Sequence, residues 1–256
     1  MGYAEIYRGY EYQNRVKKEH FYVVRRNYYH TVKVIKDVFN DLSAGKELDY
    51  KKVLDLSESI YSCSDCGSCY IRIITELKEL SDYTYIHSIN TAFYSMLIGK
   101  WLGFPGTDIK KVIQSGLLHD IGKAKIPDKV LNKKGVLNKD EMEIMQRHPI
   151  IGYEMLNHIK DIDTNIKRAV LLHHMRLDGS GYPLDSNADC IGIITRIVAV
   201  ADVFDAMTSD RVYKKRVTPL EAFEMFKTDG IRLFDQNIVN VFLDNLPAYL
   251  PRRGKF

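Results

Sequence analysis

The stretch Val112–Asp120, with the sequence VIQSGLLHD, places apolar residues at helical spacing and ends on a histidine followed by an aspartate. A second stretch, Leu171–Pro183 with the sequence LLHHMRLDGSGYP, takes an apolar segment to two adjacent histidines and a glycine-rich loop. Each imidazole needs a hydrogen-bond partner when it is buried, so adjacent histidines are costly to place in a core. Titratable side chains at the ends of apolar helices therefore indicate a shared interior site.

The same arrangement recurs along the chain. His87 interrupts the apolar segment YTYIHSINTAFY, His148 begins HPIIGYEML, and Asp202 lies inside RIVAVADVFDAM. The steps between these positions are 25 to 32 residues, about one helix and one loop each. Because no convincing strand of period 2 appears, the fold class is all-α, a helical bundle in which each helix brings one or two ligands to the interior. The candidate metal ligands are His87, His119, Asp120, His148, His173, His174 and Asp202.

These seven side chains are too many for one tetrahedral ion and suit two ions, each completed by water. A carboxylate at Asp120 can bridge two ions. Imidazole and carboxylate ligands without thiolate favour iron or manganese, with zinc as an alternative. Each residue alone has a simpler explanation, since a single buried histidine is more often hydrogen-bonded in a core. The joint pattern favours metal, because several buried titratable groups without an ion are an unexplained cost.

The cysteines allow two interpretations. Cys63, Cys66 and Cys69 have the C-x2-C-x2-C spacing of some metal sites, with only Cys190 or a distant histidine available as a fourth ligand. Their flanks have helical character, and cysteines at i, i+3 and i+6 also follow one face of a helix. We favour the structural interpretation.

The periodicity predicts a long N-terminal helix to about residue 40, a break at 42–50, and helices separated by short loops to the end of the chain. Thr107 is a candidate cap, 126–138 is expected to be a loop, and Asn138, Pro149 and the capping box TPLE at 218–221 mark helix starts. The predicted helices are 48–62, 66–80, 83–102, 108–119, 138–147, 149–159, 163–175, 195–209 and 235–244. We divide the chain into an N-terminal helical segment, 1–45, and a main domain, 46–250.

The chain has 256 residues, a formal net charge of +4 and 45% hydrophobic residues, an ordinary globular balance. The mild charge permits an anionic small molecule and argues against nucleic acid as a partner. No apolar run is long enough to span a membrane, and the N-terminus lacks a signal-peptide layout, so we expect a cytoplasmic protein. The ending LPRRGKF lacks a domain-like closure, so we expect a piece of a longer protein.

The motifs resemble those of the HD-GYP family, a branch of the HD-domain metal-dependent phosphohydrolases that hydrolyses cyclic diguanylate (c-di-GMP). The resemblance spans about residues 46–245 and is carried by YTYIHSIN, GLLHDIGKAKIPD, HPIIGYEML, LLHHMRLDGSGYP, RIVAVADVFDAMTSDRVYK and TPLEAFE. It implies an HD-domain helical bundle with an N-terminal helical extension. It also implies that the seven candidates bind two or three ions, with Asp120 as the bridging ligand.

The resemblance implies a phosphodiesterase that gives linear pGpG, or further GMP, with a bridging hydroxide as the nucleophile. Paired ions supply such a nucleophile near neutral pH and hold the phosphate. Lys123 is expected to contact the phosphate or protonate the leaving oxygen. Arg211 and Lys214 are expected to contact phosphates, and Gly181, Tyr182 and Pro183 the nucleotide. Without the resemblance, these stretches are a solvated basic face and a tight loop.

Two departures from the family pattern affect the prediction. Met175 follows the histidine pair where the family usually has glutamate, so a carboxylate that orients a ligand is absent there. Members with three ions use a glutamate one turn before the first histidine, and Tyr83 stands there, so we predict two ions. Two other functions stay open: a non-catalytic c-di-GMP receptor and a phosphohydrolase of another nucleotide. The N-terminal helix is expected to be a connector or a dimerisation element.

Overall fold

The computed structural model describes residues 3–76, 83–183, 190–209, 216–228 and 230–250. These residues form helices and short connections, and their only strand-like pairing is an isolated bridge between Met175 and Gly181. The predicted all-α fold class is therefore confirmed. Among the described helices, none combines the length and the apolar character needed to cross a bilayer.

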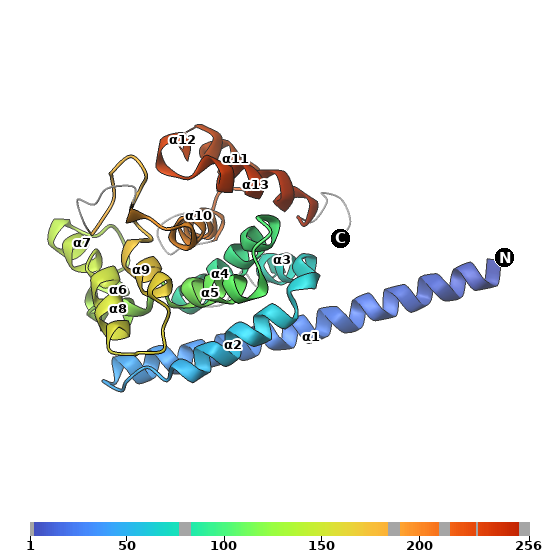
Figure 1. The fold of residues 1–256 in the computed structure, drawn as a ribbon, viewed down its shortest axis with the longest axis horizontal. Helices are drawn as coiled ribbons and strands as arrows, with labels where there is room; N and C mark the ends of the chain where they lie inside the picture. The colour runs from blue at the N-terminus through green and yellow to red at the C-terminus, as the bar shows by residue number, and fades with distance from the viewer. Residues whose placement is uncertain (1–2, 77–82, 184–189, 210–215, 229, 251–256) are drawn as a thin grey trace.

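The long N-terminal helix α1 runs from Tyr3 to Ser43, and its N-terminal part extends past the rest of the fold (Figure 1). Its second half packs into the main hydrophobic core through Val24, Tyr28, Ile35 and neighbouring apolar residues. The prediction of one long helix is confirmed. The division of the chain at residue 45 stays a prediction. Residues before and after this position belong to the same hydrophobic core.

Helices α4 (Tyr83–Trp101), α5 (Gly106–Leu118), α9 (Thr164–Leu172) and α10 (Ile193–Thr208) pack against one another at the centre of the fold. Their buried positions are mostly apolar, but α4, α5 and α10 also bury polar side chains, among them Asn90, Gln114 and Asp205. Helix α10 is buried along most of its length. These four helices bring the polar residues at their ends and faces into one interior region.

The remaining elements surround this centre (Figure 1). Two groups flank it: α2, η1 and α3 on the side of α1, and α11, α12 and α13 toward the C-terminus. Their bounds are α2 Tyr50–Ser62, η1 Ser64–Cys66, α3 Gly67–Glu76, η2 Ile121–Lys125, α6 Asp128–Leu131, α7 Lys139–Met145, α8 His148–Asn157, α11 Pro219–Thr228, α12 Gly230–Leu233, α13 Gln236–Asn245 and η4 Leu246–Ala248.

Several predicted boundaries are confirmed. The Asn138 side chain and Glu141 form a reciprocal capping box at the start of α7, and Thr218 and Glu221 exchange the same two bonds before α11. Pro149 lies in the first turn of α8. The predicted cap at Thr107 is wrong, because α5 already begins at Gly106 after Pro105. The expected loop at 126–138 contains the short helix α6.

Candidate metal centre

The seven candidate ligands lie where helices meet at the interior. His87 is in the second turn of α4, His119 is the C-cap of α5, and Asp120 follows it directly. His148 is the first residue of α8, and His173 is the C-cap of α9, with His174 next in the chain. Asp202 projects from the buried length of α10. Adjacent residues converge here because they stand where a helix ends and the backbone leaves the helical path.

A close backbone approach holds two of these elements together. Gly122 in η2 lies so near α8 that a Cβ atom there would be 2.0 Å from the carbonyl oxygen of His148 and 2.6 Å from the amide nitrogen of Gly152. Only glycine permits this contact. The contact places the turn that carries Asp120 directly beside the helix start that carries His148.

The histidine rings are oriented by hydrogen bonds from their Nδ1 atoms. For His119, His148 and His173, Nδ1 lies 2.8–2.9 Å from a backbone carbonyl oxygen three residues earlier. For His87, Nδ1 lies 2.7 Å from Oδ2 of Asp205. An Nδ1–H donor in each case leaves Nε2 as the inward-facing ligand atom, the tautomer that metal-binding histidines use.

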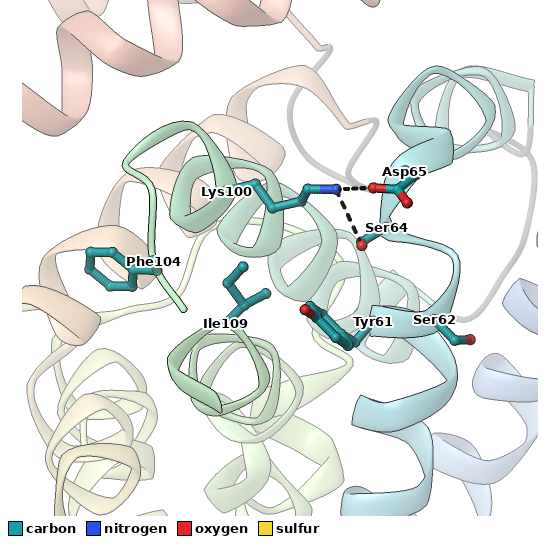
Figure 2. Close-up of a pocket in the computed structure, with 7 residues that line it drawn as sticks. All are labelled: Tyr61, Ser62, Ser64, Asp65, Lys100, Phe104 and Ile109. Carbon is teal, nitrogen blue, oxygen red and sulfur yellow. Dashed lines mark hydrogen bonds and ion pairs between the residues drawn. The ribbon is translucent and has the colours of Figure 1, made fainter. Parts of the chain in front are cut away.

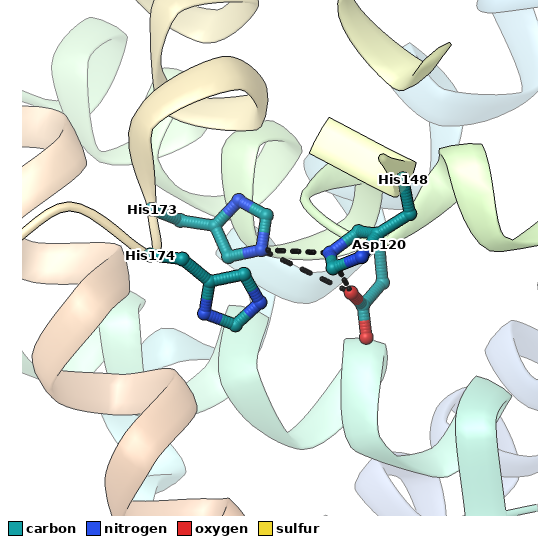
Figure 3. Close-up of side chains that lie close together, drawn as sticks. All are labelled: Asp120, His148, His173 and His174. Carbon is teal, nitrogen blue, oxygen red and sulfur yellow. Dashed lines mark hydrogen bonds and ion pairs between the residues drawn. The ribbon is translucent and has the colours of Figure 1, made fainter. Parts of the chain in front are cut away.

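The ligand atoms form two adjacent groups, in each of which the atoms lie within 4.8 Å of one another. Asp120, His148, His173 and His174 make the first group (Figure 3), and His87, His119 and Asp202 make the second. Asp120 faces both. Its Oδ1 lies 3.1 Å from Nε2 of His148, whereas its Oδ2 lies 3.4 Å from Nε2 of His119.

Hydrogen bonds within the protein leave several polar atoms of these two groups without a partner. Nε2 of His148 and Nε2 of His173 lie 3.3 Å apart, although both rings use Nδ1 as the donor, so two lone pairs face each other. Nε2 of His119 and Oδ1 of Asp120 are buried without any hydrogen-bond partner. Such buried orphans are rare and costly. A cation between these atoms would satisfy them all, so the donor set fits metal ions.

The surroundings keep the acids ionised and two histidines neutral. Burial alone would raise the pKa of Asp120, but the Lys123 ammonium and the His119 imidazole hold it well below its ordinary value. Burial and the neighbouring imidazoles lower the pKa of His173 well below its ordinary value. Burial is also the main cause that lowers the pKa of His174 to about 3. Deprotonated acids and neutral imidazoles are the forms that bind metal.

His87 is the exception. Burial would lower its pKa, but hydrogen bonds to Asp202 and Asp205 outweigh burial and raise the pKa to about 9. Its Nε2 lies 2.9 Å from Oδ1 of Asp202 and its Nδ1 is bonded to Asp205. The ring therefore carries a proton between two carboxylates when no cation replaces that proton.

The predicted substrate residues lie partly beside these groups. Lys123 donates to Oδ2 of Asp120, and the Tyr182 ring lies 4.6 Å from the His174 ring. Gly181 has a φ of +99°, and a Cβ atom there would be 2.2 Å from the carbonyl oxygen of His174, so glycine brings the loop against the ligand pair. The Tyr182–Pro183 peptide bond is cis. Arg211 and Lys214 lie outside the described residues.

Sequence reasoning missed Asp205, the carboxylate that orients His87. Its position three residues after Asp202 in an apolar helix was the available signal, because a second buried acid needs a partner as much as the first.

Met175, by contrast, does not point at the ligands. Its side chain is buried with Leu172 and Ile191 in a separate small apolar cluster.

The cysteines take no part in either ligand group. Cys63 caps the end of α2, and Cys66 and Cys69 are joined by a disulfide across the start of α3. No group of metal-ligating side chains within the described ranges includes a cysteine. The structural interpretation agrees with this arrangement, but the single helical face assumed for the three residues is wrong, because a break separates α2 from α3.

A pocket of about 420 Å³ lies apart from the ligand groups (Figure 2). It is lined by residues at the end of α2 and in η1, and by Lys100, Phe104 and Ile109 around the connection from α4 to α5, remote from His87 and His119. Lys100 is already paired with Asp65 and bonded to Ser64. The pocket therefore belongs to the packing between α2, α4 and α5 and not to the metal centre.

An all-α bundle that brings two groups of histidine and aspartate side chains together at its centre is the arrangement that the resemblance to HD domains implied. The HD-domain family model matches residues 77–238. The chain belongs to the HD-domain family, as the resemblance of its motifs indicated.

Several curated relatives are cyclic-dinucleotide phosphodiesterases. The chain is 32% identical over 216 residues to a cyclic di-GMP phosphodiesterase of Pseudomonas aeruginosa, covering 84% of this chain and 52% of the relative. It is 42% identical over 148 residues to a cyclic di-GMP phosphodiesterase response regulator of Xanthomonas campestris pv. campestris, covering 57% and 39%. A 3'3'-cGAMP-specific phosphodiesterase of Vibrio cholerae is 34% identical over 179 residues, covering 70% and 34%. The chain thus spans about half or less of these relatives.

A solved structure shares the fold. An HDG"Y"P protein from Bdellovibrio bacteriovorus superposes with a TM-score of 0.62 at 16% sequence identity, covering 86% of this chain and 70% of that protein. At this identity the likeness shows the common helical architecture alone.

Proposed function

We propose that the protein is a metal-dependent phosphodiesterase that hydrolyses c-di-GMP to linear pGpG. The observation that carries this proposal is the pair of adjacent ligand groups, both of which Asp120 faces, together with the buried unsatisfied atoms Nε2 of His119 and Oδ1 of Asp120. Relatives named as cyclic di-GMP phosphodiesterases support the substrate class.

Two ions would be held, one by His148, His173 and His174 and one by His87, His119 and Asp202. Asp120 would bridge them, because its two oxygens face different groups. Imidazole and carboxylate donors without thiolate favour iron or manganese over zinc. Bound ions would activate a water for attack near neutral pH and neutralise the phosphate oxygens.

The protein groups around the ions then have distinct tasks. Water adds to phosphorus, the bond from phosphorus to the 3' oxygen breaks, and that oxygen takes a proton. Lys123 lies beside Asp120 with its side chain one-fifth exposed, so its ammonium can reach a phosphate oxygen or protonate the leaving oxygen. Burial raises the pKa of Tyr182, so its hydroxyl stays a neutral donor for the nucleotide. Arg211 and Lys214 would bind phosphates.

Turnover assays on protein purified without oxygen and loaded with Mn²⁺ or Fe²⁺ test this function. Hydrolysis of c-di-GMP to pGpG, with loss of activity in Asp202→Ala, is the expected result. Preferential hydrolysis of 3'3'-cGAMP would move the substrate to that of the Vibrio cholerae relative. Binding of c-di-GMP without turnover in any metal state would instead make the protein a receptor, the function that the missing carboxylate at Met175 favours.

Two further predictions concern the oligomeric state of the protein and its location in the cell. Dimerisation through α1, whose N-terminal part extends past the bundle, stays a prediction (Figure 1). Light scattering that determines the molar mass of the full chain and of a variant with substitutions in α1 can test it. The cytoplasmic location also stays a prediction, which cell fractionation tests.

A further inference from the structure

A buried chain of hydrogen bonds leads from helix α1 to the metal centre. The hydroxyl of Tyr28 on α1 donates to Oδ1 of Asn90 on α4 at 2.8 Å. Nδ2 of Asn90 donates to Oδ1 of Asp205 on α10 at 2.9 Å. The other oxygen of Asp205 accepts from Nδ1 of His87 at 2.7 Å. All four side chains are 2% exposed or less.

The order of donors and acceptors in this chain is fixed. Burial and the charge of Asp205 raise the pKa of Tyr28, so its hydroxyl keeps its proton and donates. Its bond to the Asn90 carbonyl oxygen turns the Asn90 amide nitrogen toward the carboxylate, whereas the flipped amide would set two oxygens against each other. Asp205 then accepts from Nδ1 of His87, which leaves Nε2 as the ligand atom.

His87 differs in this respect from three of the other ligands. His119, His148 and His173 are oriented by carbonyl groups of their own helical turns. The orientation of His87 depends on a side chain from another helix, and through it on α1. His87 is therefore a ligand whose orientation depends on side chains from α10, α4 and α1.

We propose that Tyr28, Asn90 and Asp205 are positioning residues for His87, so that α1 sets the affinity of the metal site formed by His87, His119 and Asp202. This inference rests on the proposed two-ion centre. It adds that the chain of hydrogen bonds from Tyr28 ends at a ligand of one of the two sites.

Stepwise Mn²⁺ titration of the full chain without oxygen, followed by electron paramagnetic resonance and metal analysis, tests the proposal. Asp205→Asn should weaken one of the two binding steps about 10- to 100-fold, as loss of a partner that orients a ligand does. Tyr28→Phe removes only one hydroxyl at the far end and should weaken the same step about fivefold. The other step should stay unchanged in both variants.

Tyr70→Phe is the matched control. Tyr70 is also fully buried and also contacts the Phe93 ring, but its hydroxyl donates to the carbonyl oxygen of Ile60, outside the chain of bonds to His87. It should leave both binding steps unchanged. In the double variant, Tyr28→Phe should add nothing to Asp205→Asn, because the two act in series.

Three results would overturn the proposal: Tyr28→Phe binding both ions like the wild type, Tyr28→Phe weakening both steps equally, or additive losses in the double variant. If Asp205→Asn does not fold, the Mn²⁺ affinities of Tyr28→Phe, which keeps the aromatic ring, and of the control Tyr70→Phe are sufficient to test the proposal. Failure of the wild-type protein to bind two ions would contradict the two-ion centre itself, which is a different outcome.

Discussion

Individual side chains at the centre have the orientation that metal binding requires even without a bound cation. The Nδ1 atoms of His119, His148 and His173 are held by carbonyl oxygens, so the rings cannot relieve their facing lone pairs by turning over. The carboxylate of Asp120 is buried with one oxygen unsatisfied. The residue types and their spacing in the sequence predicted this gathering, but not which nitrogen or oxygen faces inward.

Replacing the shared carboxylate should remove more metal than replacing an unshared one. We expect Asp120→Ala to lose both ions, because each oxygen faces a different ligand group. Asp202→Ala should lose one, because Asp202 belongs only to the group with His87 and His119. Metal analysis of the purified variants measures this difference. Two retained ions in Asp120→Ala would contradict the bridging role.

Metal binding should release a proton from His87. Its pKa is raised to about 9 in the metal-free protein, so at pH 7 an incoming cation must displace that proton. Each pH unit between 7 and 9 should therefore strengthen binding at this site about tenfold, and the gain should level off above pH 9. Calorimetric titration in buffers of different ionisation enthalpy measures the released proton. His87→Gln should abolish the release, and affinity independent of pH in the wild type would contradict the assignment.

At the scale of the element, local signals predicted where helices begin. The capping residues Asn138 and Thr218 act on their own first turns, so the sequence alone was sufficient. Helix α6 was missed because four residues between loop-forming neighbours carry too little periodicity. The break between α2 and α3 was predicted, since the predicted helices 48–62 and 66–80 are separate, but the short helix η1 that fills it and the disulfide between Cys66 and Cys69 were not.

The contact between η2 and α8 leaves no room for a side chain at Gly122. We expect Gly122→Ala to lower the free energy of unfolding by about 1–3 kcal/mol, because a Cβ atom would overlap backbone atoms of His148 and Gly152. The same change should weaken metal binding, since it separates Asp120 from His148. Gly192→Ala is the control, because a Cβ atom there meets nothing within 4 Å. Denaturant unfolding of the two variants makes the comparison, and equal stabilities would show that the approach tolerates a side chain.

At the scale of the whole molecule, helix periodicity and the regular spacing of the polar residues predicted a bundle with a shared interior site. The spacing could not predict that the second half of α1 is part of the core, or that Asn90 and Asp205 connect α1 to His87. Such contacts join residues more than 60 positions apart and depend on how complete helices pack. The substrate-binding positions Arg211 and Lys214 stay predictions.

Removing the ions should destabilise the entire bundle, because the ligands come from α4, α5, α8, α9 and α10. Ions at 100 times their dissociation constant stabilise the native state by about 2.7 kcal/mol per site. For a chain of this size, that predicts a fall in Tm of about 5–10 °C per site on chelation. Calorimetry before and after treatment with a chelator, and again after Mn²⁺ is restored, measures the change. An unchanged Tm would show that the buried groups are satisfied without metal.

The most direct measurement is anomalous diffraction at the manganese edge from crystals grown with Mn²⁺. We predict two peaks, one within bonding distance of His148, His173 and His174 and the other of His87, His119 and Asp202, with an oxygen of Asp120 bound to each. A single peak, or peaks away from these side chains, would contradict the two-ion centre.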